Sequence, residues 1–387
     1  MKKITFVIPS RNNLEFLKLA YDSIRKLETK HEILILNDAS IDGTSEWIKN
    51  IDDPDLIVYE NEGPERIGIV GMFDKGIEMA RTDIIFAYHA DMVAAPNLDK
   101  YILEHLEEGT VVSATRVEPP LHPEGPEKII EDFGSEADQF DYDKFANWAK
   151  QLKFSSGQVT EGVFAPWCMY KKDFLAIGGH DELFAPQSRE DSDLFNRFHL
   201  AGYKFKQSWD ALVYHFTSRG SRFNKHAGGD TKVDSPEWQK TNTKNVRNFV
   251  RKWGTLVTHD DHLKPIVAPK YDIGFVVKNC QLFHLFELEP WCSNIYVDSE
   301  NLQYICKEQE NTTYNLSERV LPFDHEKYND ILIEFDASFV TQNKFSNYIM
   351  QFPMIIKDSG SIGTASMDIF IINIQSMNTY EKELIHA

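Results

Sequence analysis

The sequence predicts a mixed α/β protein with a mostly parallel central sheet, followed by a second, smaller α/β module. Three observations support this prediction. From residue 4 to residue 88, short segments rich in β-branched and aromatic residues alternate with amphipathic segments. Pro265 and Pro269 punctuate a stretch that separates this region from a further set of apolar segments. At 387 residues, the chain is longer than one ordinary hydrophobic core requires.

The elements of the first part follow one another in strand–helix order. Residues 4–8 form a buried strand that Pro9 ends, and Asn12 or Asn13 caps the helix that follows. Short connections between strands and helices predict parallel strands joined by crossover helices, which is a Rossmann-like arrangement. The helix at residues 238–253 has a basic face, which we expect to be exposed to solvent. The further strands are expected at residues 32–37, 56–59, 83–88 and 211–216, and the helices at residues 14–27, around Trp47 and Ile48, and at residues 68–80, 190–201 and 238–253.

Residues 116–160 interrupt this pattern with four prolines and many polar side chains. They also contain an aromatic group at Phe140, Tyr142, Phe145 and Trp148. We expect a solvated loop with a short helix, and the alternative is a lid over the substrate.

The second module follows a linker at residues 256–270 and extends over residues 271–387. We find no arrangement of residues in it that points to catalysis. His259-Asp260-Asp261-His262 lies within this linker, where a loop is a simpler interpretation than a metal site. Strands are expected at residues 273–277, 295–297, 331–335 and 369–374, and helical segments at residues 281–288 and 343–356.

The composition excludes several classes of partner. The net charge of −19 argues against nucleic acid and against anionic lipid, because both are bound by basic surfaces. No apolar run approaches the ~20 residues that span a bilayer, and the N-terminal segment contains too few apolar residues for a signal peptide. The four cysteines show no Cys-x-x-Cys spacing, which favours reduced thiols and a cytoplasmic protein.

Two common nucleotide-binding motifs are missing. A Gly-x-Gly-x-x-Gly motif would follow the first strand of a dinucleotide-binding fold, but Pro9-Ser10-Arg11-Asn12 stands there. The chain also lacks the Gly-Lys-Ser/Thr sequence of a P-loop. NAD-dependent enzymes and P-loop ATPases are therefore disfavoured.

Asp91 follows the strand at residues 83–88, and ligands of open α/β sheets bind beyond the carboxyl ends of the strands. A carboxylate at that place suits a hard divalent cation, and such a cation binds a nucleotide diphosphate. His215 lies in the strand at residues 211–216. An acid at a strand end also commonly caps a turn, so Asp91 alone does not define a site.

Two charged clusters add to this candidate site. Glu190, Asp191 and Asp193 lie at a predicted helix N-terminus, where they either compensate the helix dipole or take part in catalysis. The loop after residue 216 is basic within an acidic chain, which indicates either an anionic ligand or a solvated loop. Its basic and hydroxyl residues include Arg219, Ser221, Arg222, Lys225 and His226.

The order of these motifs resembles glycosyltransferase family 2, whose members have the GT-A fold. The resemblance covers about the first 255 residues and implies a GT-A domain over residues 1–255. The matching segments are Val7-Ile8-Pro9-Ser10-Arg11-Asn12, Leu36-Asn37-Asp38-Ala39-Ser40, Asp42-Gly43-Thr44, Ile67-Gly68, Asp74-Lys75-Gly76, Ala90-Asp91, Gly178-Gly179-His180-Asp181-Glu182, Glu190-Asp191 and Tyr214-His215.

The resemblance implies roles for individual residues. Asp91 stands at the final acid of an Asp-x-Asp motif that binds Mn²⁺ or Mg²⁺, and His89 replaces the first acid. His215 resembles a histidine that some members use as a further metal ligand, and its imidazole suits Mn²⁺ better than Mg²⁺. The nucleotide-sugar donor is expected to contact Pro9, Ser10, Arg11, Asp38, Arg66, Gly68, Ala90, Asp91, Arg219, Ser221 and Arg222.

The implied reaction is the transfer of a sugar, with inversion, from a nucleotide sugar to a hydroxyl group of a glycan, lipid-linked or protein acceptor. A UDP-sugar is the expected donor. The second module is expected to bind the acceptor or to assemble a homo-oligomer. Asp191 is implied as the general base that takes the hydroxyl proton, and Glu190 as a residue that orients the acceptor or the loop.

Two other functions stay open from the sequence. A sugar-nucleotide pyrophosphorylase on a related fold would need a Gly-rich N-terminal loop with a basic residue, which this chain lacks. A non-catalytic nucleotide- or glycan-binding protein would explain His89, whereas the retention of both Asp91 and Asp191 argues against it.

Overall fold

The computed structural model describes residues 2–152, 157–298 and 301–386, and the chain divides into two compact units. The first unit contains the chain up to Asn242 together with His259–Ile266. The second unit contains Thr243–Thr258 and the chain from Val267 to His386. The predicted linker is thus shared between the two units, and the domain boundary near residue 255 stays a prediction.

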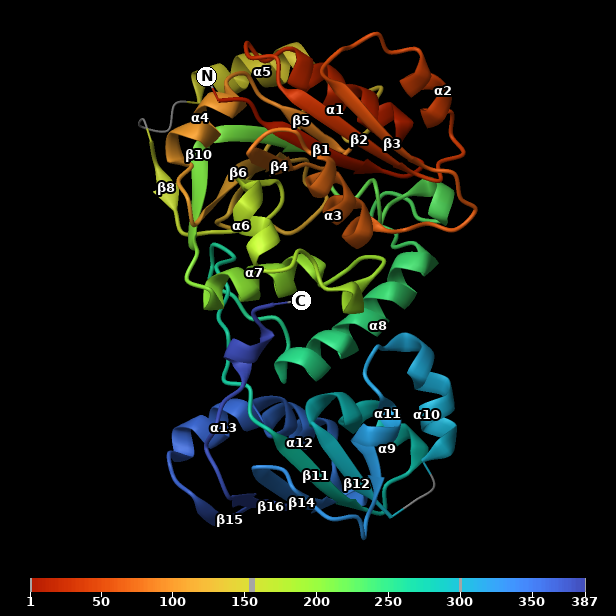
Figure 1. Cartoon of the computed structure of the whole chain (residues 1–387), viewed down its shortest axis with the longest axis vertical. Helices are drawn as coiled ribbons and strands as arrows, with labels where there is room; N and C mark the ends of the chain where they lie inside the picture. The colour runs from red at the N-terminus through yellow and green to blue at the C-terminus, as the bar shows by residue number, and fades with distance from the viewer. Residues whose placement is uncertain (1, 153–156, 299–300, 387) are drawn as a thin grey trace. The chain divides into compact units, whose positions relative to one another are not determined.

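The first unit is organised around a mostly parallel sheet, which confirms the predicted fold class (Figure 1). Its strands are β1 (Thr5–Ser10), β2 (Glu32–Asp38), β3 (Leu56–Asn61), β4 (Ile84–Ala87), β5 (Met92–Ala94), β6 (Thr110–Glu118), β7 (Lys128–Ile130), β8 (Val159–Thr160), β9 (Trp167–Tyr170) and β10 (Lys204–His215). Among the described residues they form a ten-stranded sheet in the order β3-β2-β1-β4-β9-β6-β10-β5, with β7 paired to β6 and β8 to β10. β1 to β4 run parallel, β6 runs parallel to β10, and β9 lies antiparallel between β4 and β6.

Helices cover both faces of this sheet because side chains alternate along each strand. Phe6 of β1 belongs to the main core together with Leu17 of α1 (Leu14–Arg25). Val7 faces α3 (Ile69–Met79) on the other side, where a Cβ on Gly76 would stand 2.5 Å from Val7 Cγ1. The other helices of this unit are α2 (Thr44–Lys49), α4 (Leu98–His105), α5 (Tyr142–Gln151), α6 (Lys171–Ala176), α7 (Glu190–Leu200) and the first part of α8 (Pro236–Trp253).

The short helix expected within residues 116–160 is α5, but parts of this segment pack against the sheet, which was not expected. β6 continues through Glu118, and Phe145 of α5 is fully buried. The rings of Phe140 and Phe145 pack against Tyr214 of β10, with centroid distances of 4.9 and 5.6 Å. These aromatic residues form a second hydrophobic core against β10, because α5 turns its apolar face toward the sheet.

The second unit is built on its own sheet, which confirms the predicted second α/β module. Its strands are β11 (Ile273–Lys278), β12 (Asn294–Val297), β13 (Val320–Pro322), β14 (Ile331–Asp336), β15 (Gly363–Met367) and β16 (Phe370–Ile374). In the described part of this unit their order is β13-β12-β11-β14-β16-β15, parallel from β13 to β14 and antiparallel from β14 to β15.

The helices of the second unit are short. The helical segment predicted at residues 343–356 is divided, because Pro353 suits the first turn of a new helix. The helices are α9 (Leu282–Leu288), α10 (Leu302–Glu308), α11 (Leu316–Arg319), α12 (Gln342–Asn347) and α13 (Phe352–Ser359).

The C-terminal part of α8 belongs to the second unit and joins it through buried ion pairs. Arg251 Nη2 lies 2.8 Å from Glu289 Oε2 and 2.6 Å from Glu308 Oε1. Arg319 Nε lies 2.6 Å from Glu289 Oε1. Arg251 is buried, as is Lys252, so the prediction of a solvated basic face was wrong for this end of the helix.

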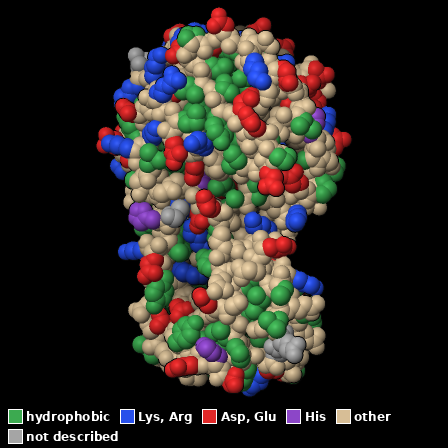
Figure 2. Space-filling model, turned by 45° about the vertical axis from the view of Figure 1, so that its right-hand side comes forward, with side chains coloured by type: hydrophobic (Ala, Val, Ile, Leu, Met, Phe, Trp, Pro, Cys, Tyr) green, Lys and Arg blue, Asp and Glu red, His purple; other side chains and the backbone are tan. Residues whose placement is uncertain are grey.

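The surface gives two further findings. In the part of the chain that the structure describes, no helix combines the length and the apolar character needed to cross a membrane. On the face shown in Figure 2, acidic and basic side chains are interspersed over the surface. The excess of acidic residues is therefore spread over this face instead of forming one patch.

Candidate active site

A cavity lies at the carboxyl ends of β1, β2 and β4, where open α/β sheets bind their ligands. His89 and Trp238 line it although the sequence analysis did not assign them to a site. Asp191, Arg219 and Arg222 are absent from its lining among the described residues. The predicted site residues that do line it are Pro9, Ser10, Arg11, Asp38, Arg66, Gly68, Ala90, Asp91, Glu190, His215 and Ser221.

Asp38 ends β2 and fixes the loop that leads into α3. Its Oδ1 accepts hydrogen bonds from Asn61 Nδ2 and from the Ile67 backbone N–H, each at 2.8 Å. Its Oδ2 accepts the Gly68 N–H at 2.8 Å. Gly68 has φ +91°, and a Cβ there would lie 2.3 Å from Pro186 Cβ, so only glycine fits this entry to the helix.

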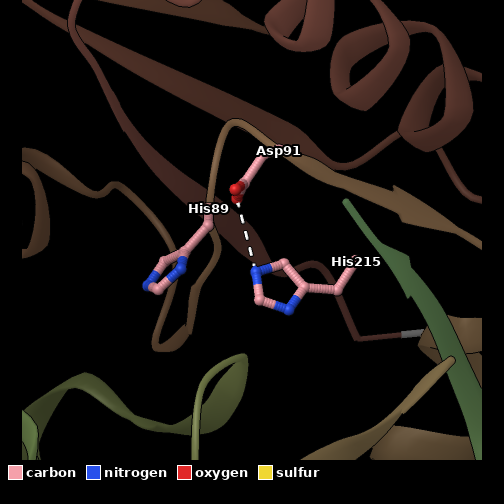
Figure 3. A group of neighbouring side chains, drawn as sticks. All are labelled: His89, Asp91 and His215. Carbon is pink, nitrogen blue, oxygen red and sulfur yellow. Dashed lines mark ion pairs between the residues drawn. The ribbon is translucent and has the colours of Figure 1, made fainter. Parts of the chain in front are cut away.

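Three potential metal ligands meet at the same sheet edge (Figure 3). β10 pairs with β5 so that His215 stands opposite Met92, the residue after Asp91. His215 Nε2 lies 3.7 Å from Asp91 Oδ1, and one ligand atom from each of His89, Asp91 and His215 lies within 4.8 Å of the others. The structure thus brings together the two predicted ligands and adds His89, which the sequence analysis treated only as a missing acid. Its position two residues before Asp91 was the available signal.

Glu118 orients the His215 ring from β6. The side chain of Glu118 is buried, and its Oε1 lies 2.8 Å from His215 Nδ1. Burial alone would raise the pKa of Glu118, but the hydrogen bond from His215 and the charges of Arg116 and Lys128 hold it well below its ordinary value. The ionised carboxylate of Glu118 accepts a hydrogen bond from the protonated Nδ1 of His215. The lone pair of His215 Nε2 is then on the side of Asp91. The sequence analysis missed Glu118.

The acids at the start of α7 differ in their surroundings. Glu190 lines the cavity, and its Oε2 is buried without a hydrogen-bond partner among the described residues. Burial, together with the neighbouring charge of Asp191, raises the pKa of Glu190 to about 8. Asp191 is close enough to His89 for its charge to act on that ring. Asp193 is structural, because it forms a fully buried ion pair with Arg197 at 2.8 Å.

Two arginines in the cavity share one acid. Glu237 Oε1 at the start of α8 lies 2.5 Å from Arg66 Nη1 and 3.4 Å from Arg11 Nη1. Arg66 Nε and Nη2 are buried without a partner among the described residues, as is Ser10 Oγ. Unpaired buried donors of this kind are costly in the free protein, and they suit a ligand rich in oxygen atoms.

Basic side chains of the loop after β10 form ion pairs with acidic side chains of the protein. Arg219 Nη2 lies 2.5 Å from the Ser135 carbonyl oxygen and 3.1 Å from Glu136 Oε1. Arg222 Nε pairs with Asp234 Oδ1 at 2.8 Å. The contact of this loop with the site is made by its backbone, since the Arg219 N–H donates to Asp91 Oδ2 at 2.7 Å.

Asp74 of α3 and His180 are hydrogen-bond partners. Asp74 Oδ2 accepts the His180 backbone N–H at 3.1 Å, and Asp74 Oδ1 lies 2.6 Å from His180 Nδ1. The pair connects α3 to the segment before α7, so these two positions depend on each other.

Comparison with known proteins finds matches for the first part of the chain. Residues 5–175 match the family model described as "Glycosyl transferase family 2". The chain is similar to poly-beta-1,6-N-acetyl-D-glucosamine synthase of Staphylococcus aureus (strain COL), with 23% identity over 209 residues that cover 53% of this chain and 48% of the synthase. It is also similar to the uncharacterized glycosyltransferase YfnE of Bacillus subtilis (strain 168), with 23% identity over 253 residues that cover 55% of this chain and 64% of YfnE. The chain therefore spans about half the length of the curated synthase that it matches.

Two solved structures show partial similarity. The crystal structure of GalNAc-T7 with UDP, GalNAc and Mn²⁺ matches with a TM-score of 0.45 and 14% identity, over 65% of this chain and 48% of that chain. The mannosyltransferase PcManGT from Pyrobaculum calidifontis, in complex with GDP-Man and Mn²⁺, matches with a TM-score of 0.42 and 16% identity, over 64% of this chain and 63% of that chain.

Proposed function

We propose, from the premise that residues 5–175 are a glycosyltransferase family 2 segment, that this chain transfers a sugar from a nucleotide-sugar donor to an acceptor hydroxyl group. One observation carries the proposal: a single cavity at the strand ends contains Asp38, a His–Asp–His cluster and an acid at a helix N-terminus. These groups match the needs of the base, the diphosphate and the reacting sugar of such a donor. A UDP-sugar is the proposed donor, and a glycan, lipid-linked or protein hydroxyl the proposed acceptor.

The donor is proposed to lie along the strand ends. Its base and ribose lie beside Pro9, Ser10 and Asp38, and its diphosphate lies beside the His–Asp–His cluster. The unpaired N–H groups of Arg66 and the Oγ of Ser10 are available to the oxygen-rich ligand. Arg219 and Arg222 retain a smaller role in this proposal, because their guanidinium groups already have acidic partners.

The residues present fit a divalent cation. His89, Asp91 and His215 would hold it, and Glu118 sets the tautomer of His215 that a ligand requires. Mn²⁺ or Mg²⁺ at this place supplies neutralisation of the negative charge that develops on the leaving diphosphate. Asp91 Oδ2 already accepts the Arg219 N–H, so Oδ1 is the oxygen that would be available to a cation.

The proposed reaction is a direct displacement with inversion at the anomeric carbon. The acceptor oxygen forms a bond to this carbon while the bond between the carbon and the diphosphate oxygen breaks, and that electron pair leaves with the diphosphate. Asp191 takes the proton of the acceptor hydroxyl group. Glu190, whose pKa is raised to about 8, is protonated at neutral pH and donates a hydrogen bond to a hydroxyl oxygen of a substrate.

A donor panel tests the proposed function. The purified chain is incubated with Mn²⁺ and a set of UDP- and GDP-sugars, with and without simple glycan acceptors, and the released nucleoside diphosphate is measured. We expect release from at least one donor and a loss of UDP binding in Asp91→Ala. A chain that binds nucleotide but releases no diphosphate from any donor would instead be a binding protein.

A further inference from the structure

We infer that the side-chain amide of Asn13, at the N-terminal end of α1, binds a phosphate oxygen of the donor diphosphate. The inference rests on the proposed function and deepens it, because it adds a residue to the donor site. The sequence analysis considered Asn13 only as a helix cap.

The side chain of Asn13 does not cap the helix that it precedes. Asn13 is the N-cap residue of α1, yet its side chain forms no capping hydrogen bond with the described residues. Asp42, from the loop after β2, accepts the first N–H of the helix instead, with Leu14 N 2.8 Å from its Oδ2. An N-cap asparagine usually accepts a hydrogen bond from the first turn of its own helix. The fold thus leaves the amide of Asn13 available for another contact.

Asn13 is buried and lines the cavity of the candidate active site. It is 6% exposed, and in the part of the chain that the structure describes its Nδ2 has no hydrogen-bond partner. Ser10 also lines the cavity, is 4% exposed and has an Oγ without a partner among the same residues. A buried donor without a partner retains the full free-energy cost of leaving water. Two such donors in one cavity indicate a ligand that carries several acceptor oxygens.

Asn13 lies beside the loop that follows β10. A Cβ added to Gly220 would lie 3.8 Å from Asn13 Nδ2. Arg219, the residue before Gly220, donates its backbone N–H to Asp91 Oδ2 at 2.7 Å. The Asn13 amide is therefore next to the loop segment that contacts Asp91, which is the part of the cavity proposed for the diphosphate.

The N-terminal end of α1 favours an anion at this place. Peptide dipoles give the N-terminal end of a helix a partial positive charge, and its free N–H groups bind phosphate. Glu15, the acidic residue of the first turn, is exposed to solvent, where its charge is screened. Phe16 packs against Phe216, with ring centroids 4.9 Å apart, which holds this end of the helix against the segment after β10.

A neutral donor matters here because the arginines of the neighbouring loop have acidic partners. Arg219 Nη2 lies 3.1 Å from Glu136 Oε1, and Arg222 Nε lies 2.8 Å from Asp234 Oδ1. Asn13 supplies an N–H donor without adding charge, next to the positive end of a helix. The phosphate contact expected from a cationic loop is thus assigned to an amide.

The test compares a ligand that has phosphate groups with one that lacks them. The affinities of the full-length chain for UDP and uridine are measured with Mn²⁺ present, by calorimetry for UDP and by ligand-detected NMR for uridine. Asn13→Ala should weaken UDP binding by about 10–100-fold, the usual effect of losing a hydrogen bond to a charged group, and leave uridine binding unchanged. Asn13→Asp should weaken UDP binding further, because it places a carboxylate against a phosphate.

Two controls separate this contact from an effect on the helix. Asn13→Ala should keep the unfolding temperature of the wild type, because the asparagine side chain does not cap α1. Asn97 is the N-cap residue of α4 (Leu98–His105), its side chain also forms no capping hydrogen bond within the described ranges, and it does not line the cavity. Asn97→Asp adds the same charge at the same helix position and should leave UDP affinity unchanged.

The outcomes distinguish this inference from the proposed function. UDP affinity of Asn13→Ala within about threefold of the wild type overturns the inference while the proposed donor still stands. Equal losses of UDP and uridine affinity, or tighter UDP binding by Asn13→Asp than by Asn13→Ala, would place the amide against a ribose hydroxyl and also overturn it. Where uridine binds too weakly to detect, the order of the two variants decides. A wild-type chain that binds no UDP overturns both the inference and the proposed donor.

Discussion

Glu190 and Asp191 are adjacent acids at the start of α7, and their different environments lead to a test of which one is the base. The pKa of Glu190 is raised to about 8 by burial and by Asp191, so Glu190 is protonated at neutral pH. Asp191→Asn should lower transfer by ~10²–10⁴-fold, the usual range for loss of a general base, and leave UDP affinity unchanged. Glu190→Gln should keep most of the turnover, because glutamine still donates a hydrogen bond. The measurement is the pH profile of kcat/KM for each variant.

The opposite pattern of activities in the two variants would identify Glu190, and not Asp191, as the general base. In that case, wild-type activity would rise through pH 8 and Glu190→Gln would lose it. A stability measurement serves as a control without substrate. An acid with a raised pKa stabilises the fold fully below its ordinary value of 4.5, and this stability is lost as pH rises through about 8. Glu190→Gln should therefore unfold at a higher temperature than the wild type above pH 8, and should lack this pH dependence.

Glu118 contacts His215 of the candidate metal site, and a matched pair of variants tests whether it supports metal binding. Both Glu118 and Glu127 lie near Arg116, at 3.6 and 3.5 Å, but it is Glu118 that contacts His215. Glu118→Gln should weaken Mn²⁺ binding by about 10–100-fold, the usual effect of losing an outer-shell partner of a histidine ligand. Glu127→Gln should leave it unchanged. Calorimetry with Mn²⁺ checks both, and equal effects of the two variants would show that Glu118 is only structural.

Three of the site residues that sequence reasoning found lie at or just beyond the carboxyl end of a strand. Asp38, Asp91 and His215 could be placed at one sheet edge because parallel strands bring their carboxyl ends together. Glu118 could not, because its contact with His215 spans 97 residues and depends on the register of β6 against β10. His89 was seen as a lost carboxylate, because its distance to His215 requires the pairing of β10 with β5.

At the scale of elements, the C-terminal part of α8 depends on a buried acid. Glu289 is fully buried between Arg251 and Arg319, and Tyr304 Oη donates to its Oε2 at 2.8 Å. Glu289→Gln leaves two buried guanidinium groups without their common partner. We expect a loss of about 3–5 kcal/mol in the free energy of unfolding, measured by urea denaturation. Glu334→Gln, which removes the acid of an exposed pair with Lys278, is the matched control and should have little effect.

The buried carboxylate of Glu289 also makes the stability of the protein depend on pH. Burial would raise the pKa of Glu289, but Arg319 and Arg251 lower it to about 2 from the ordinary value of 4.5. A lowered pKa means that the stabilisation is complete above pH 4.5 and is lost as pH falls toward 2. The free energy of unfolding of Glu289→Gln should therefore lie furthest below that of the wild type at neutral pH. The two values should approach each other as the pH falls toward 2. A constant difference across this range would contradict the assignment.

Elements with a strong local pattern were predictable, whereas elements defined by partners were not. β1, β2 and β4 are continuous apolar segments that need no further information. The exposed edge strand β15 reads Gly-Thr-Ala-Ser-Met and has no apolar alternation, so it exists through its pairing with β16. The packing of α5 was not predicted because four prolines earlier in residues 116–160 suggested a loop, whereas Phe145 of α5 packs against Tyr214 on a distant strand.

At the scale of the whole molecule, every residue that lines the cavity belongs to the first unit. A shortened chain ending at Ile266 should therefore bind UDP with unchanged affinity when it is folded. The cut is placed there because His259–Ile266 belongs to the first unit, where Lys264 pairs with Glu161. The cut also exposes Phe249 and Trp253 of α8, so we expect a lower unfolding temperature. Calorimetry checks both, and a folded shortened chain without UDP affinity would contradict this prediction.

The sequence order predicted two modules but not how the chain divides between them. A boundary near residue 255 follows from the end of a helix and the prolines beyond it. The actual grouping places Thr243–Thr258 with the second unit and returns His259–Ile266 to the first. This exchange depends on tertiary contacts, such as the close approach of the His262 carbonyl to Gly162, which no local pattern encodes.

In the proposed reaction, the histidine at position 89 has a consequence for the final step. One carboxylate and two neutral imidazoles carry a charge of −1. Together with a bound divalent ion, these three ligands would therefore have a net charge of +1. Two carboxylates and one imidazole would leave it neutral. The extra positive charge attracts the nucleoside diphosphate most strongly after the sugar has departed, when the diphosphate has gained a negative charge. Departure of this product, and not bond breaking, should then limit turnover. A rapid burst of sugar transfer followed by a slower steady rate, in an otherwise ordinary transferase, is the kinetic behaviour that this single replacement predicts.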